Sequence, residues 1–371
     1  MMNYKVIKTK EIPPRYILES GEKLFSINDV LFDILTEYNL CGDYDRISKR
    51  INDKYKDDSL TDGKFIEDSI RDVQNLIDKN EKEGGNYIKN RVKIMRGEMA
   101  NRVYNILSFL FDKSLFTLCS VLFSLITFLF FYINDIGIYE SYEIIYDNFS
   151  VENVIVLYLF FLVVIFLHEM GHAAATYSFG EQPKEIGFGM YFIFPVLYTD
   201  TTNIWKLKKK ERIIVNLGGI YIQLIINIIL VMLYYILNNN LVLILIISNT
   251  ISIITSLNPF FRYDGYWIYS DLFQISNLKN KTSELTRILF FSPHRMKEVV
   301  HQKPLLIYSI LNLVFWIFVT IYLFIYIYSS AGEIQNIIHS KDWISISSIR
   351  LLSSIIFVCI GVFNLVKTIK N

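Results

Sequence analysis

Two histidines and a glutamate, in the order His168-Glu169-Met170-Gly171-His172, lie inside an apolar run long enough to cross a membrane. Residues four apart share one face of an α-helix, so His168 and His172 can hold one metal ion together. The pattern His-Glu-x-x-His on a helix is typical of a zinc metalloprotease, in which the glutamate is the general base. The pattern therefore predicts peptide-bond hydrolysis.

The alternative is that this pentapeptide is accidental, as such patterns often are in soluble loops. In a transmembrane helix, however, it would place three ionisable side chains in hydrocarbon. An aspartate at the centre of a membrane helix costs about 2.5–3.5 kcal/mol, and a glutamate should cost a similar amount. Ionisable residues within a membrane are therefore functional candidates by default, and we favour the metal site.

A catalytic zinc usually has three protein ligands and one open position, so a third ligand is required. Asp264 is the candidate, because it follows Asn258-Pro259 at the end of another apolar run and precedes Gly265. The proline ends or kinks the helix, which allows the chain to turn Asp264 back toward the histidines. The alternative for Asp264 is a solvated turn residue at a helix end.

Two residues are expected to act in catalysis. Glu169 is placed to take a proton from the attacking water and pass it to the leaving amine. Asn258 can donate a hydrogen bond to a developing oxyanion or to the substrate backbone, although a satisfied helix end before proline explains it equally well. Another group of small and polar residues can either line the cavity or hold helices together, namely Asn216, Gly218, Gly219 and Gln223.

The composition indicates a mainly α, polytopic membrane protein. The chain has 371 residues, of which 52% are hydrophobic and 15% aromatic, and the apolar residues gather in long blocks. A net charge of +1 gives no reason to expect nucleic acid as a partner. The three cysteines, Cys41, Cys119 and Cys359, are too far apart to suggest a disulfide framework or a cysteine metal site.

About six apolar runs have the roughly 20 residues that cross a bilayer. They cover residues 115–134, 153–178, 212–237, 241–260, 304–328 and 347–368. Lysine and arginine gather in the connections 180–211 and 262–303, whereas 135–152 carries acidic residues but no Lys or Arg. The positive-inside rule therefore predicts that both termini and the N-terminal part of the chain lie in the cytoplasm.

One apolar segment, from Gly187 to Leu197, is too short to span a membrane and contains Pro195. Non-helical backbone at membrane depth must be buried in protein or line a wet cavity, so we predict a re-entrant hairpin or loop packed on the site. An exposed strand edge in this segment would bind an extended substrate by strand addition.

The chain divides into three predicted parts. Residues 1–85 form a small cytosolic α+β domain, because a hairpin pattern from Tyr16 to Ile27 and three amphipathic helical patterns are compatible with a winged-helix arrangement. Residues 86–114 form a basic linker and an interfacial amphipathic helix. Residues 115–371 form the transmembrane metalloprotease domain.

The motifs also point to a family. The segment from His168 to His172, with Asn258-Pro259 and Asp264-Gly265, resembles the site-2 protease family of intramembrane zinc metallopeptidases. Three segments also resemble, more narrowly, a bacterial branch of that family that is tied to ribosomally made peptides. These segments are Pro195 to Trp205, Arg212 with Asn216-Leu217-Gly218-Gly219, and Asn258 to Trp267. Members of that branch often carry an N-terminal PqqD-like domain that holds a precursor's leader peptide, and residues 15–80 look similar to it.

The resemblance, which covers about residues 90–290, implies Zn²⁺ as the cofactor and His168, His172 and Asp264 as its ligands. It also implies Glu169 as the catalytic acid–base and a role for Asn258 near the substrate. One departure is that four residues, Phe260-Phe261-Arg262-Tyr263, separate the Asn-Pro and Asp-Gly pairs, where other site-2 proteases have two.

We therefore expect a multi-pass intramembrane zinc metalloendopeptidase of the bacterial inner membrane that acts in maturation or export of a ribosomally synthesised peptide, as in bacteriocin biosynthesis. The expected partners are a precursor or membrane-associated peptide substrate, a peptide exporter or modifying enzyme, and the lipid bilayer. Two alternatives stay open. One is a non-catalytic membrane partner for peptide export or immunity, and the other is a regulatory protease that cuts a membrane-tethered transcription factor.

Overall fold

The computed structural model describes residues 4–9, 11, 13–20, 23–56, 63–82, 88–191, 194–291 and 303–329. The chain divides into two units, Met1–Asn258 and Pro259–Asn371, which are described in turn. The boundary follows Asn258, where Pro259 cannot continue a helix.

The first unit begins with a small α+β domain. Strands β1 (Lys5–Lys8), β2 (Tyr16–Ser20) and β3 (Lys23–Ile27) form an antiparallel sheet in that order, which confirms the predicted hairpin. Three helices follow, as the amphipathic patterns indicated, and they are α1 (Asp29–Cys41), α2 (Tyr44–Tyr55) and α3 (Gly63–Lys82). Leu18, Leu35 and Val73 join the sheet to helices α1 and α3 in one apolar cluster. The PqqD-like identity of this domain stays a prediction.

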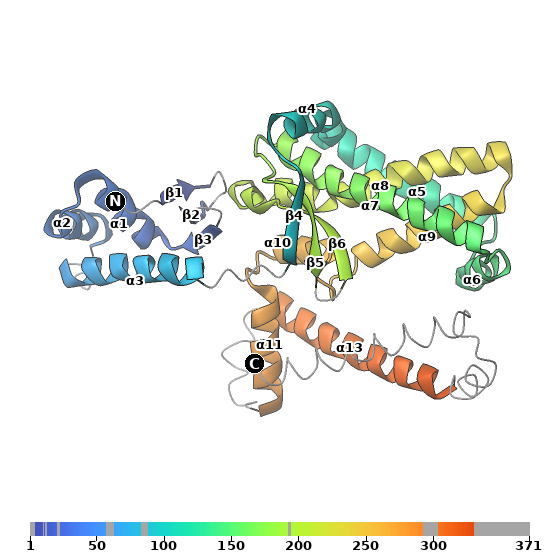
Figure 1. Cartoon of the computed structure of the whole chain (residues 1–371). Helices are drawn as coiled ribbons and strands as arrows, with labels where there is room; N and C mark the ends of the chain where they lie inside the picture. Colours follow the sequence, from blue (N-terminus) through green and yellow to red (C-terminus); the bar gives the residue numbers. More distant parts are fainter. Residues whose placement is uncertain are drawn as a thin grey trace. The chain divides into compact units, whose positions relative to one another are not determined.

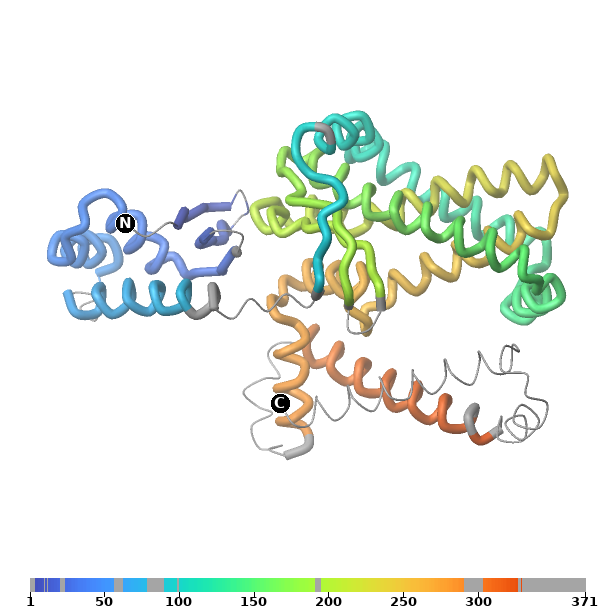
Figure 2. The backbone as a smooth tube through the Cα atoms, in the orientation of Figure 1, coloured from blue at the N-terminus to red at the C-terminus, as the bar shows by residue number. Residues whose placement is uncertain are grey.

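Three long apolar helices dominate the rest of this unit. Helices α5 (Lys113–Ile133), α7 (Val151–Ser178) and α8 (Lys209–Leu237) are each long and apolar enough to cross a membrane. Helix α9 (Asn240–Ser256), predicted as a span over 241–260, has only 17 residues. Helices α7, α8 and α9 pack in sequence, and α7 and α8 lie side by side along much of their length (Figure 2).

Two connections differ from the sequence-based predictions. Residues 88–95, expected to be part of a linker, form strand β4 (Ile88–Met95), because Val92 and Ile94 alternate with charged residues. The amphipathic helix predicted after it is α4 (Gly97–Ser108). The acidic connection 135–152 contains a short helix that the sequence analysis missed, α6 (Ile138–Asp147).

The segment from Gly187 to Leu197 forms a hairpin, one of the two forms predicted. Its strands are β5 (Ile186–Tyr191) and β6 (Phe194–Thr199), and β4 pairs with β5 to give a second antiparallel sheet in the order β4-β5-β6 (Figure 1). Strand β6 packs against α7, which carries the histidines. The depth of this hairpin in a membrane stays a prediction.

The second unit contains helices α10 (Asp264–Leu272), α11 (Leu278–Phe291) and α13 (Lys303–Ser329). Residues 303–325 of α13 form the fourth helix that can cross a membrane, and the span predicted at 347–368 lies outside the described residues. Tyr266, Leu278, Leu285, Leu305 and Tyr308 form the core of this unit. The Tyr308 hydroxyl donates to the carbonyl oxygen of Pro259 at 2.8 Å, which fixes the turn that precedes Asp264.

Candidate metal centre

The two histidines lie in the C-terminal half of α7, where this helix packs closely on α8. A Cβ atom built on Gly171 would lie 2.4 Å from the carbonyl oxygen of Gly218, and one on Gly218 would lie 2.7 Å from that of Gly171. Only glycine at both positions lets the two backbones approach so closely. Close packing also buries His172, which is 8% exposed, among alanines with no exposed surface.

Gly219 serves His168 rather than the packing of the two helices. A Cβ atom at this position would lie 2.4 Å from Nε2 of His168 and 2.5 Å from two of its ring carbons. The absent side chain therefore leaves the space that the imidazole occupies. The sequence analysis left open whether the two glycines line the site or join helices, and the structure assigns Gly218 to packing and Gly219 to the site.

Hydrogen bonds fix the tautomer of both rings. Nδ1 of His172 lies 2.8 Å from the carbonyl oxygen of Val215, which can only accept, so this nitrogen carries the proton. Nδ1 of His168 lies 3.0 Å from Oε1 of Gln223. The amide nitrogen of Gln223 donates to Asn249 and Ser252, which sets Oε1 toward His168. In the neutral form, each ring therefore presents an unprotonated Nε2, as metal-binding histidines do.

The two Nε2 atoms lie 3.1 Å apart. Two nitrogen ligands about 2.0–2.1 Å from one tetrahedral ion lie about 3.3 Å apart, so this separation suits a shared zinc ion. With both protons on Nδ1, the lone pairs of the two Nε2 atoms face each other. That arrangement is favourable when a cation lies between them, and the donor pair therefore fits a divalent metal.

A buried amide network supports this orientation from α8 and α9. Asn249, with no exposed surface, donates to the carbonyl oxygen of Gln223 at 3.0 Å and to Oδ1 of Asn227 at 2.7 Å. Asn227 in turn donates to Thr250 at 2.9 Å. The sequence analysis noted Gln223 but missed the two asparagines, although Gln223 and Asn227 are four residues apart and share one face of α8.

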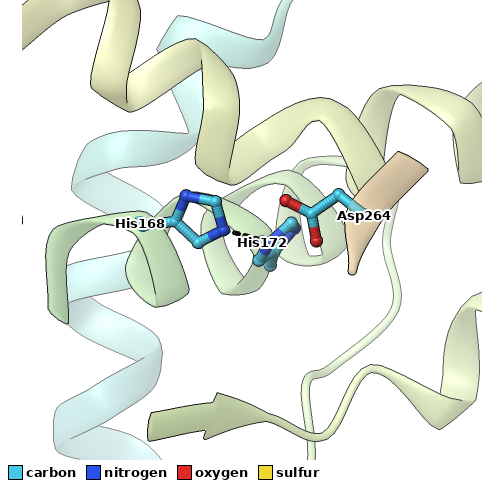
Figure 3. A group of neighbouring side chains, drawn as sticks. All are labelled: His168, His172 and Asp264. Atoms are coloured by element: carbon cyan, nitrogen blue, oxygen red, sulfur yellow. Dashed lines mark hydrogen bonds between the residues drawn. The ribbon is translucent and has the colours of Figure 1, made fainter. Parts of the chain in front are cut away.

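Asp264 is the first residue of α10, with Gly265 buried beside it. One ligand atom from each of His168, His172 and Asp264 lies within 4.8 Å of the other two (Figure 3). These are the three residues that the sequence analysis named as ligands. Metal binding by this group stays a prediction.

The two predicted catalytic residues are both partly buried. The carbonyl oxygen of Glu169 accepts a hydrogen bond from the Thr199 hydroxyl at 2.9 Å, so β6 contacts α7 at the predicted general base. Asn258 follows the last turn of α9, and its backbone N–H donates to the carbonyl oxygen of Thr255 at 3.1 Å. This bond agrees with the helix-end interpretation of Asn258, and its predicted role near the substrate stays a prediction.

Comparisons with known proteins agree with this chemistry. A family model described as peptidase family M50 matches residues 156–366. A protein of Bacillus subtilis (strain 168), named "Putative peptide zinc metalloprotease protein YydH", is 25% identical over 198 residues, which cover 53% of this chain and 77% of the relative. No solved structure gives a significant match.

Proposed function

Since this chain belongs to peptidase family M50, the site-2 proteases, and is an integral membrane metalloprotease, we propose that it is a zinc endopeptidase whose site is formed by His168, His172 and Asp264. The observation that carries this proposal is the pair of imidazoles. Both Nδ1 atoms are held by acceptors, and the two Nε2 atoms converge to 3.1 Å.

The donor set suits zinc, because two imidazole nitrogens and one carboxylate are a frequent ligand set of catalytic zinc sites. Zinc, when bound, would polarise a peptide carbonyl and lower the pKa of water to about 7. The grouping of the three ligand atoms within 4.8 Å supports this assignment. Gln223 and the carbonyl oxygen of Val215 would keep both rings in the metal-binding tautomer.

Glu169 would act as the general base and then as the general acid. Its position one residue after His168 places it on a neighbouring face of α7, near the ligands but outside the ligand group. The carboxylate would take a proton from the attacking water and deliver it to the leaving nitrogen. Asn258 would donate a hydrogen bond to the oxyanion that develops on the scissile carbonyl.

The substrate would be an extended peptide that pairs with the edge of β6. Among the described strands, β6 pairs only with β5, so its other edge can accept a further strand. Pro195 agrees with this position, because proline in a sheet is confined to edge strands, strand starts and bulges. The contact of Thr199 with the Glu169 carbonyl brings this strand next to the proposed base.

The peptide would be a small membrane-associated or leader-bearing precursor, processed in maturation or export, with a peptide exporter or modifying enzyme as a further partner. The small N-terminal domain would recruit it, because β3 is an edge strand of the first sheet. The concentration of Lys and Arg in two connections supports a cytoplasmic location of both termini. The apolar helices and the bacterial relative support a bacterial inner-membrane location.

The decisive experiment compares Glu169→Gln with His168→Ala and Asp264→Asn in the purified full chain. Glu169→Gln should keep its zinc and lose at least about 100-fold in cleavage of a fluorescein-labelled casein probe. His168→Ala should lose both zinc and cleavage, and Asp264→Asn should lose cleavage and retain only weak zinc binding. Glu152→Gln, an exposed change in the first turn of the same helix, is the matched control and should change neither. Full cleavage by Glu169→Gln would refute the proposed mechanism.

A further inference from the structure

Arg91, on β4, lies at the centre of a charged cluster that the proposed chemistry does not use. Its Nη2 donates to Oε1 of Glu185 at 2.9 Å and to Oδ2 of Asp200 at 3.2 Å. Its Nε donates to the hydroxyl of Tyr198 at 2.7 Å, and the guanidinium lies 4.5 Å from the centre of that ring. With Lys93, whose Nζ lies 2.9 Å from Oε2 of Glu185, these residues form what we call the Arg91 clamp.

The two carboxylates and the guanidinium of the clamp are largely shielded from solvent, whereas Lys93 is 45% exposed, and the two positive charges balance the two negative ones. The side chains of Glu185 and Asp200 are 7% and 14% exposed, and that of Arg91 is 21% exposed. Burial raises the pKa of Glu185, but hydrogen bonds from Lys93 and Tyr198 and the charge of Arg91 outweigh it, so the pKa lies below its ordinary value. The pKa of Asp200 is lowered in the same way, against burial, by hydrogen bonds from Thr202 and Arg91. Both carboxylates are therefore ionised around neutral pH.

The second sheet is built to accommodate this clamp. A Cβ atom on Gly187 would lie 2.6 Å from the Tyr198 hydroxyl, so the absence of a side chain on β5 leaves room for that group. Gly187 is also the residue that pairs with Tyr198 across the β5–β6 ladder and with Lys93 across the β4–β5 ladder. One arginine on β4 thus fixes β6 across the intervening strand.

Thr199 connects the clamp to the proposed general base. It lies between Tyr198 and Asp200, both of which Arg91 binds, and its hydroxyl donates to the Glu169 carbonyl oxygen at 2.9 Å. A carbonyl oxygen has two lone pairs, so this oxygen can accept from Thr199 besides any bond within the helix. The strand and the helical turn that carries Glu169 are therefore held at a fixed separation.

We propose that Arg91 is a positioning residue for Glu169, acting through Thr199, so that a peptide paired with β6 meets the general base at a fixed distance. This inference rests on the proposed function of Glu169. Lysine cannot replace the arginine here, because an ammonium group lacks the planar fork that binds Glu185, Tyr198 and Asp200 together.

The test uses Arg91→Lys, Thr199→Val and the double variant, with Arg102→Lys as an exposed control on α4 and Thr199→Ser as the conservative replacement. Arg91→Lys should lower kcat on fluorescein-labelled casein about tenfold, and Thr199→Val about fivefold, with KM and zinc content unchanged. The double variant should lose no more than Arg91→Lys alone, because both changes break one connection. Thr199→Ser and Arg102→Lys should match the wild type.

Hydrogen exchange gives a readout that does not depend on cleavage. In Arg91→Lys, amides of residues 194–199 should exchange about tenfold faster, while those of α5 stay unchanged. Three results would each overturn the inference. The first is unchanged exchange of this strand in Arg91→Lys, and the second is a loss of kcat in the double variant equal to the product of the two single losses. The third is an effect on KM alone. Cleavage by Glu169→Gln would instead refute the proposed function and leave the exchange result standing, so the two failures are distinguishable.

Discussion

Gly219→Ala should remove zinc without weakening the fold. The new Cβ atom would lie 2.4 Å from Nε2 of His168. The imidazole can rotate away from this contact, so the backbones of α7 and α8 need not move apart. To reach an ordinary contact the imidazole must retreat by about 1 Å, roughly five times the 0.2 Å tolerance of a metal–ligand distance. His168 would then no longer be a ligand of the same ion as His172.

The expected loss of zinc affinity is at least about 100-fold, or roughly 2.8 kcal/mol, because removing even an outer-shell partner of a ligand costs 10–100-fold. Thermal stability of the metal-free protein should hold or rise slightly, since alanine is favoured over glycine in a helix by about 0.5–1 kcal/mol. Zinc affinity is measured by competition with a chelator, and stability by thermal unfolding of the metal-free protein in detergent.

Gly218→Ala is the matched control, one residue earlier on the same helix. Its Cβ atom would lie 2.7 Å from the backbone oxygen of Gly171, which cannot rotate away. Helices α7 and α8 would have to separate, and overpacking of this kind costs about 1–3 kcal/mol of stability. Wild-type zinc affinity in Gly219→Ala, or a larger zinc loss in Gly218→Ala without a loss of stability, would refute the assignment of Gly219 to the site.

Two further predictions concern the surroundings of the site. Gln223→Leu removes the acceptor for Nδ1 of His168 and should weaken zinc binding about 10–100-fold in the same chelator assay, whereas equal affinity would show that the tautomer needs no such partner. The pKa values of Glu185 and Asp200 are lowered in the folded protein, so their contribution to stability is present above the unfolded carboxyl pKa of about 4 and is lost as the pH falls through the lower folded values. Hydrogen exchange of β5 and β6, residues 186–191 and 194–199, should therefore accelerate below about pH 4, and less so in Asp200→Asn. An exchange rate independent of pH, after correction for intrinsic chemistry, would contradict this.

Features encoded within one helix or one hairpin were predicted from the sequence. The spacing of His168 and His172 is a property of a single helix, and the hairpin from Tyr16 to Ile27 needs only a turn between two short strands. Asp264 was named because Pro259 must break the preceding helix, a local rule as well. These predictions required no knowledge of which distant segments meet.

Features that depend on distant partners were missed. Residues 88–95 looked like a basic linker, because the strand pairs with β5 about a hundred residues later and four of its eight residues are polar or charged. Arg91 had no visible role for the same reason, since Asp200 lies 109 residues away. Asn249 was overlooked because the sequence does not show that this asparagine of α9 lies beside Gln223 of α8, to which it donates a hydrogen bond. Hydrophobic periodicity indicates which face of a helix or strand is buried, but it does not indicate which other segment packs against that face.

Both imidazoles are oriented by groups of the same neighbouring helices. The acceptors for both Nδ1 atoms, and the two side chains that orient Gln223, all come from α8 and α9. Orientation of the two nitrogen ligands therefore depends on how α7 packs on α8, through Gly171 and Gly218, and on the space that Gly219 leaves for His168. This orientation precedes metal binding rather than following from it. A ligand pair set by packing retains its geometry when the carboxylate is removed. Asp264→Asn should then bind zinc weakly but measurably, whereas Gly219→Ala, which keeps all three ligands, should bind it no better.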